Sequence, residues 1–271
     1  MTPSGIITLT TDFGRRDPYV AMMKGVILSI NRDARIVDIT HLITAGSVKE
    51  GASILADSHR YFPSGTVHVA VVDPGVGGPR RPIALATETH FFVGPDNGLF
   101  WPVIQASGQC HVIHLTDKRY WMKDISPTFH GRDIFAPVAA YLSQGVNPFL
   151  MGEKIDDPMS LPAPLPRKEN NGLAGEIIRI DHFGNLITNI TREHLGPFLQ
   201  SKGLTIRIGG LVLHRVNTTY SDVPEGQALA LIGSSDELEI AVNRGNAARD
   251  LGEGCRAGTK VVVDFGDSTT H

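Results

Sequence analysis

The sequence has few of the features that mark several large classes of protein. Its 271 residues include two cysteines, Cys110 and Cys255, which are far apart and outside any metal-type pair, so neither a disulfide scaffold nor a cysteine zinc site is expected. The longest apolar runs are too short to cross a bilayer, which excludes a membrane protein of the helical type. The formal net charge is -3 with no long run of one sign, so a nucleic-acid partner is not expected. Met1–Gly5 is not followed by a basic and then apolar signal region, and we expect a cytoplasmic protein.

The first part of the sequence alternates between strand-like and helix-like segments. Hydrophobic residues make up 41% and charged residues 20%, as in ordinary soluble globular proteins. Apolar or β-branched runs predict strands over residues 6–11, 35–39, 66–72, 82–87, 91–93 and 111–115, whereas helical spacing covers 19–31, 47–62, 100–106 and 133–143. This alternation predicts an N-terminal α/β/α domain over residues 1–157, with a mostly parallel sheet covered on both faces.

The composition changes after this region. Four prolines, at positions 158, 162, 164 and 166, lie among Asp, Lys and Asn, and we predict a linker over residues 158–172. From there on the pattern is rich in strands, predicted over 173–180, 186–190, 204–208, 211–216, 228–232, 238–242 and 260–265, with one short helix near 191–200. Many short strands with Gly-rich turns predict a second domain over residues 173–271, either a small barrel or a sandwich.

The stretch from Thr66 to Arg81 carries the first candidate functional residues. It begins as a buried strand and stops at Asp73-Pro74, since proline cannot continue a central ladder. A Gly-rich turn and Arg80 follow, which places a carboxylate at the carboxyl end of a strand and a cation shortly after it. Asp12 ends the first strand in the same way. Open α/β sheets bind ligands at this edge, where a carboxylate often accepts hydrogen bonds from ribose hydroxyls; the alternative is a turn with a solvated basic pair.

Two further motifs hold candidate residues, each with a structural alternative. The motif Phe129-His130-Gly131-Arg132-Asp133 puts His130 at the start of a predicted helix, where it could act as a base or orient a water molecule. In the structural alternative, Asp133 caps that helix and His130 has only a packing role. Asp181-His182-Phe183-Gly184-Asn185 lies between two strands and offers an acid, an aromatic face and an amide. That combination suits an amino-acid head group or a ring, although it is also ordinary hairpin-turn chemistry. Gly233-Ser234-Ser235-Asp236 has the same ambiguity.

Taken together, the motifs resemble one known family. They occur in this order: Thr11-Asp12-Phe13-Gly14, Val72-Asp73-Pro74-Gly75-Val76-Gly77 with Arg80, Phe129-His130-Gly131-Arg132-Asp133, Asp181-His182-Phe183-Gly184-Asn185 and Glu239-Ile240-Ala241-Val242-Asn243. The chain resembles the S-adenosyl-L-methionine (SAM) hydrolases that form adenosine, also called SAM hydroxide adenosyltransferases, which are relatives of fluorinase and chlorinase. The resemblance covers nearly the whole chain. It implies a C-terminal β-barrel and a homotrimer, with each site between the N-domain of one subunit and the C-domain of its neighbour.

The resemblance also implies a role for each candidate residue. Asp73, Arg80 and His130 would be the catalytic triad that handles water, and because halogenases of the superfamily lack the Asp-Pro-Gly-Val-Gly turn and its arginine, the triad points to water and not halide. The implied substrate-binding set is Asp12 for the ribose, Asp181, Asn185 and Ser234 for the methionine end, Phe183 for the adenine, and Phe13. The implied reaction is hydrolysis of SAM to adenosine and L-methionine by in-line attack on the ribose C5′, with SAM as substrate, no cofactor and no metal.

Two other functions fit the residues alone. Asp12, Asp73, Asp96 and His130 at one sheet edge would imitate the ligand set of a metal-dependent phosphohydrolase. A SAM- or nucleoside-binding sensor without catalysis would bind SAM without turnover and tolerate loss of His130. Chelation and product analysis distinguish these functions from hydrolysis.

Overall fold

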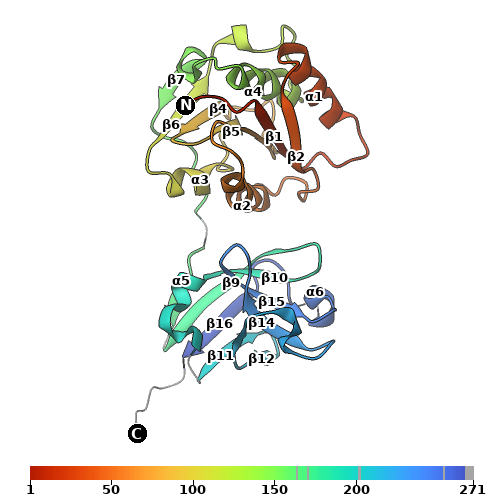
Figure 1. The fold of residues 1–271 in the computed structure, drawn as a ribbon, viewed down its shortest axis with the longest axis vertical. Coiled ribbons are helices and arrows are strands. Elements are labelled where there is room, and N and C mark those ends of the chain that lie inside the picture. The colour runs from red at the N-terminus through yellow and green to blue at the C-terminus, as the bar shows by residue number, and fades with distance from the viewer. Residues whose placement is uncertain (163, 170, 201–202, 253, 266–271) are drawn as a thin grey trace. The chain divides into compact units, whose positions relative to one another are not determined.

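The structure is a computed structural model that describes residues 1–162, 164–169, 171–200, 203–252 and 254–265. The chain forms two compact units, residues 1–162 and 163–271 (Figure 1). Residues 163, 170 and 266–271, which fall within the predicted linker and C-terminal domain, lie outside the described residues.

The first unit is built on a seven-stranded sheet with the order β2-β1-β3-β5-β4-β6-β7. Its strands are β1 Ile6–Thr11, β2 Arg35–Thr40, β3 Val67–Val71, β4 Pro82–Thr87, β5 Phe91–Pro95, β6 Cys110–Leu115 and β7 Gly152–Ile155. The pairs β1–β2, β1–β3 and β3–β5 are parallel, whereas β4–β5, β4–β6 and β6–β7 are antiparallel. The sheet is therefore mixed, and the prediction of a mostly parallel sheet was wrong for its second half.

The turn between β4 and β5 explains this difference. Only residues 88–90 separate the two strands, and the Thr87 amide donates to the carbonyl of His90. A connection this short can join only antiparallel strands, because a parallel pair needs a crossover of a dozen or more residues. The apolar pattern of residues 82–93 identified both strands, but their direction depended on the length of the turn.

Helices cover both faces of this sheet (Figure 1). They are α1 Tyr19–Ile30, α2 Val48–Ser58, α3 Trp101–Ala106 and α4 Ala136–Ser143. Alternate residues of β3 point to opposite faces, so Val67, Val69 and Val71 pack in one core with α1 and α4, while Ala70 packs in a second core with α2 and α3. No helix within the described ranges is long and apolar enough to span a membrane.

The second unit is a sheet of short strands with the order β12-β11-β16-β9-β10-β15-β14-β13, with β8 paired to β9. The strands are β8 Arg167–Glu169, β9 Gly172–Ile180, β10 Leu186–Thr191, β11 Leu204–Ile208, β12 Leu211–Leu213, β13 Val216–Asn217, β14 Ala228–Ile232, β15 Glu237–Val242 and β16 Lys260–Phe265, with short helices α5 Arg192–Leu195 and α6 Ala247–Asp250. β12 contacts β14 from the other half of the order, so the sheet curls around its main hydrophobic core. The segment predicted as one strand over 211–216 is divided between β12 and β13, and β8 lies inside the predicted linker.

A buried histidine cluster lies beneath β3, on the face covered by α2. His68 is fully buried, its Nδ1 is 2.8 Å from Thr8 Oγ1, and its ring lies 6.1 Å from that of His59 and 5.1 Å from that of His90. Burial lowers the pKa of His68 to about 2, and the charges of His90 and His59 add to this effect. His68 is therefore a neutral core residue.

This cluster predicts a loss of stability in acid. His68 becomes protonated near pH 6.5 in the unfolded chain but only near pH 2 in the folded chain. The contribution of neutral His68 to the free energy of unfolding is therefore fully present above pH 6.5 and decreases as the pH falls below that value. Between pH 6.5 and 4.5 the expected loss from this residue is about 2.5 kcal/mol. We expect His68→Gln to unfold with a flatter pH dependence, measured as free energies of urea unfolding at both pH values. Equal slopes for the variant and the parent chain would contradict this account.

Candidate functional site

A pocket of about 210 Å³ lies at the carboxyl ends of β1 and β3. Asp12 follows β1 directly and Asp73 follows β3 by two residues, so the two parallel strands bring both carboxylates to one edge. The pocket is lined by Asp12, Phe13, Gly46, Val71, Asp73, Pro74, Val76, Thr128, Phe129, His130 and Gly131. The three motifs of the first domain thus meet at one site.

Arg80 joins Asp73 to His130. Arg80 Nε donates to Asp73 Oδ1 at 3.0 Å and Nη2 donates to Asp73 Oδ2, a two-pronged pair between planar groups. Nη2 also lies 2.8 Å from His130 Nδ1. The side chain of Asp73 is 5% exposed and that of Arg80 9%, so water screens this ion pair little. The structure brings together the three predicted catalytic residues, although Arg80 and His130 are 50 positions apart in the chain.

The contact with Arg80 also determines how His130 is protonated. Burial lowers the pKa of His130 below its usual value, and the charge of Arg80 lowers it further, against the opposing effect of Asp73 and Asp133. A guanidinium has no acceptor, so Nδ1 must accept the hydrogen bond from Arg80. The proton of the neutral ring is then on Nε2, and His130 presents an N–H donor.

A glycine allows the Asp73 turn to approach the His130 loop. Gly77 has a φ of 75°, and a Cβ atom there would lie 2.3 Å from the carbonyl oxygen of Pro127. Only glycine accommodates both the left-handed backbone and this approach. The Gly-rich turn therefore serves packing between two loops as well as access to the pocket.

Asp133 anchors the loop that carries His130. Its buried carboxylate accepts from the Ser126 amide at 2.8 Å and pairs with Arg132. The chain forms a π-type turn over Gly131–Phe135 before α4, and the side chain of Asp133 caps no helix there. The alternative in which Asp133 is a cap was therefore wrong. The signal for its anchoring role was an acid inside an otherwise apolar helical segment.

The predicted binding residues Asp12 and Phe13 also line this pocket. Asp12 Oδ2 accepts from the Gly46 amide at 2.8 Å, which fixes one oxygen of the carboxylate. The ring of Phe13 lies edge to face against those of Tyr19 and Phe129, with centroids 5.9 and 5.8 Å away. Phe13 therefore packs against these two rings and also lines the pocket.

The Asp181–Asn185 motif forms the turn of the β9–β10 hairpin in the second unit. Asp181 Oδ1 accepts from the amides of Phe183 and Asn185 at 2.9 and 2.8 Å, and Asn185 Nδ2 donates to Asp181 Oδ2 at 2.9 Å. The turn chemistry expected as the structural alternative is therefore present. It leaves the Phe183 ring 71% exposed, while Asn185 is buried.

A second pocket, of about 380 Å³, lies beside this turn within the second unit. Its lining is Arg179, Asp181, Phe183, Ile187, Tyr220, Leu231, Ile232, Gly233, Ser234, Ser235, Glu237 and Glu239. The structure brings Asp181, Phe183 and Ser234 to one pocket, whereas Asn185 is not part of its lining. Sequence reasoning gave no role to the polar lining residues Tyr220 and Glu239, although Glu239 begins one of the family motifs. The available signal was an acid inside the strand Glu237–Val242.

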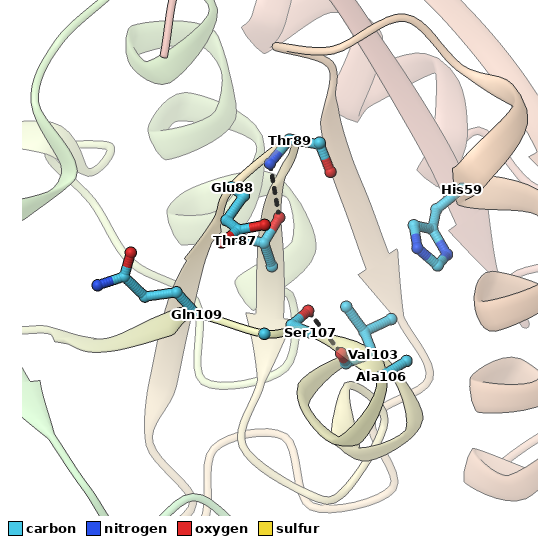
Figure 2. Close-up of a pocket in the computed structure, with 9 residues that line it drawn as sticks. His59, Thr87, Glu88, Thr89, Val103, Ala106, Ser107 and Gln109 are labelled. Atoms are coloured by element: carbon cyan, nitrogen blue, oxygen red, sulfur yellow. Dashed lines mark hydrogen bonds between the residues drawn. The ribbon is translucent and has the colours of Figure 1, made fainter.

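Other parts of the first unit do not contribute to these pockets. Asp96, a predicted metal-ligand candidate, pairs with Arg81 at 2.6 Å and accepts from the Met159 amide. Across the described ranges no group of three or more His, Cys, Asp or Glu side chains is arranged to hold a metal ion. A further pocket of about 170 Å³, lined by His59, Glu88 and Gln109 among others, includes Thr87 at the far end of β4 and none of the predicted site residues (Figure 2).

Comparisons with known proteins identify the family of this chain. The family models described as the SAM hydroxide adenosyltransferase N-terminal and C-terminal domains match residues 7–152 and 175–261. A Salinispora tropica protein named (R)-S-adenosyl-L-methionine hydrolase is 40% identical over 255 residues, which cover 93% of this chain and 95% of the relative. A fluorinase of an Actinoplanes species is 32% identical, over 88% of this chain and 91% of its own length. The crystal structure of an uncharacterized conserved protein from Thermotoga maritima superposes with a TM-score of 0.89 at 34% identity, covering 95% of this chain and 99% of that one. The chain therefore belongs to the SAM hydroxide adenosyltransferase family.

Proposed function

We propose that this protein hydrolyses SAM to adenosine and L-methionine, with water attacking the ribose C5′ in line with the departing sulfur. The observation that carries the proposal is the hydrogen-bonded Asp73–Arg80–His130 cluster at the edge of the pocket, in which the ion pair is buried and His130 is half-buried. The relative from Salinispora tropica bears the name of this activity. SAM is the substrate, and no cofactor is proposed.

The main task of the protein in this reaction is to position the nucleophile. The sulfonium is already a good leaving group, so its departure needs no general acid. Holding water in line with the C–S bond supplies several kcal/mol of the barrier reduction, because a bimolecular encounter becomes a positioned one. A hydroxide-like nucleophile and a sulfonium lose charge as they react, so a pocket with little water favours the transition state.

The three side chains have distinct roles in this proposal. His130 donates from Nε2–H to the oxygen of the nucleophile and orients it, because Arg80 occupies Nδ1. Arg80 Nη1 is buried and has no hydrogen-bond partner among the described residues, so it is a suitable donor to a hydroxide-like oxygen. Asp73 then remains as the proton acceptor of the cluster.

The binding residues are divided between the two pockets. In the first, Gly46 fixes one oxygen of Asp12, and the other oxygen, which has no hydrogen-bond partner among the described residues, would accept from ribose hydroxyls, with Phe13 beside it. In the second, Asp181 and Ser234 bind the methionine end and Phe183 stacks on the adenine. Asn185 contributes by holding Asp181 in place.

We also propose the assembly that joins the pockets. A homotrimer of two-domain chains, with residues 1–157 as the α/β domain, 158–172 as the linker and 173–271 as the β-barrel domain, would combine the first pocket of one subunit with the second pocket of its neighbour. Ligand sites commonly occur at such boundaries. A cytoplasmic location fits the two unpaired cysteines, Cys110 and Cys255.

Solvent labelling tests the reaction. In heavy-oxygen water, with and without EDTA, we expect the label in the 5′ hydroxyl of adenosine, unlabelled methionine and equal rates. Label in methionine, or a halogenated nucleoside in chloride buffer, would contradict attack by water at C5′. Loss of activity on chelation would favour the metal-dependent phosphohydrolase, and SAM binding without products would favour the sensor.

A further inference from the structure

Glu239 is a buried acid in the wall of the second pocket. It lies on β15, is 6% exposed, and its Oε1 accepts from Tyr220 Oη at 2.6 Å. Its Oε2 has no hydrogen-bond partner within the described part of the chain. A Cβ on Gly233 would lie 2.7 Å from this oxygen, so the glycine leaves room for the acid next to Ser234. The free oxygen of Glu239 is therefore held beside one of the residues proposed to bind the methionine end.

The surroundings of Glu239 favour a positive ligand. Asp181, Glu237 and Glu239 all line the pocket, together with one guanidinium, that of Arg179. Arg179 Nη2 lies 3.6 Å from Glu237 Oε2, so its charge is already shared with another acid. Three carboxylates with one cation leave the pocket with an excess of negative charge, which a bound cation would neutralise.

The same surroundings destabilise the ionised form of Glu239 when no ligand is bound. Burial raises the pKa of Glu239, and the charge of Asp181 raises it further, although the bond from Tyr220 and the charge of Arg179 oppose this. Burial and the bond to Glu239 raise the pKa of Tyr220 in turn, so its phenol keeps its proton and donates. A buried acid that only filled space would be better replaced by an apolar residue. A ligand cation accounts for its position.

We propose that Glu239, positioned by Tyr220, is a specificity-determining residue that binds the ammonium group of the amino-acid end of SAM, together with Asp181. The inference rests on the proposed function and adds the group that distinguishes SAM from sulfonium nucleosides without an amine. The carboxylate lies on a strand, so the site is rigid on this side. Tyr220 is a positioning residue, since its hydroxyl contacts Glu239.

The test combines two variants with two substrates. The substrates are SAM and its desamino analogue, which keeps the sulfonium and the carboxylate. Glu239→Gln keeps the shape and the bond to Tyr220 but loses the charge, and Tyr220→Phe removes the hydroxyl. Glu225→Gln is the matched control, because Glu225 is an exposed acid of the same unit that pairs with Arg244 and does not line the pocket. Both KM and kcat are measured, and Kd by calorimetry, so that the result does not depend on turnover.

We expect Glu239→Gln to weaken SAM binding about 10- to 100-fold, with kcat changed by less than about threefold. Binding of the desamino analogue should be nearly unchanged, Tyr220→Phe should show a smaller loss of the same selectivity, and Glu225→Gln should match the parent chain. Equal losses for both substrates, or no loss, would overturn the inference and make Glu239 structural. If the parent chain prefers SAM to the analogue in Kd but releases no adenosine, the proposed hydrolysis fails while the role of Glu239 is still decided by the Kd values.

Discussion

Replacing His130 by alanine is expected to slow turnover of SAM about a hundredfold to ten-thousandfold, while SAM binds with nearly the same affinity. His130 lines the first pocket with Asp73 and contacts Arg80, and its proposed partner is the nucleophile and not the substrate. A group whose interaction develops in the transition state changes the rate more than ground-state binding. Single-turnover rates and calorimetric Kd values on the same preparations measure both quantities.

His130→Gln is the informative companion to this variant. A glutamine amide offers an oxygen to accept from Arg80 Nη2 and an NH₂ group to donate in place of Nε2–H. If orientation is the task of His130, this variant should recover part of the activity that alanine loses. If affinity falls in proportion to rate, His130 is a binding or structural residue, and unchanged turnover in the alanine variant removes it from the mechanism.

Mixing two chains that are each impaired in a different pocket, assayed at SAM concentrations well below KM, is expected to restore about a quarter of the sites. His130→Ala removes the proposed water-orienting group of the first pocket. Asp181→Asn removes the charge proposed to bind the ammonium group but keeps an oxygen that accepts from the Phe183 and Asn185 amides. If one site uses the first pocket of one subunit and the second pocket of its neighbour, random trimers of the two chains contain intact pairs. Activity after joint unfolding and refolding, relative to each chain alone, measures this recovery.

A mixture of the parent chain with the double variant His130→Ala/Asp181→Asn is the control. Shared sites predict that about a quarter of the sites are intact in an equal mixture, whereas sites within one chain predict about a half. No recovery from the two single variants, together with half activity in this control, would contradict the shared site. Sedimentation of the parent chain checks the trimer itself.

Most of the elements, and the motifs that line the first pocket, were predictable from local patterns, whereas Tyr220 and Glu239 of the second pocket were not. The alternation of Val67, Val69 and Val71 identified the central strand, and proline and glycine after Asp73 marked its end. Asp12 and Asp73 could be placed at one edge because both follow strands. These predictions succeed because strand periodicity and turn chemistry are properties of a few consecutive residues.

The sheet and the anchoring residues needed more than local patterns. The direction of β4 depends on a three-residue turn, and the mixed sheet follows from it. Asp133 and Glu239 resemble ordinary helix and strand residues in the sequence, and only their buried hydrogen bonds with Ser126 and Tyr220 reveal what they hold. Burial of a polar group depends on which segments pack over it, and those segments are distant in the chain.

The sequence by itself determined the motifs from which the candidate residues were chosen, and the strands and turns on which those motifs lie. It also determined the resemblance to SAM hydrolases, because that rests on motifs and their order. The tertiary structure decided how these residues are connected: that Arg80 lies between Asp73 and His130 and occupies His130 Nδ1, which leaves an N–H donor on the other nitrogen. The protonation state of a side chain depends on its distance from other charged groups and on its burial. Arg80 and His130 are 50 positions apart in the sequence, so they come into contact only in the folded protein.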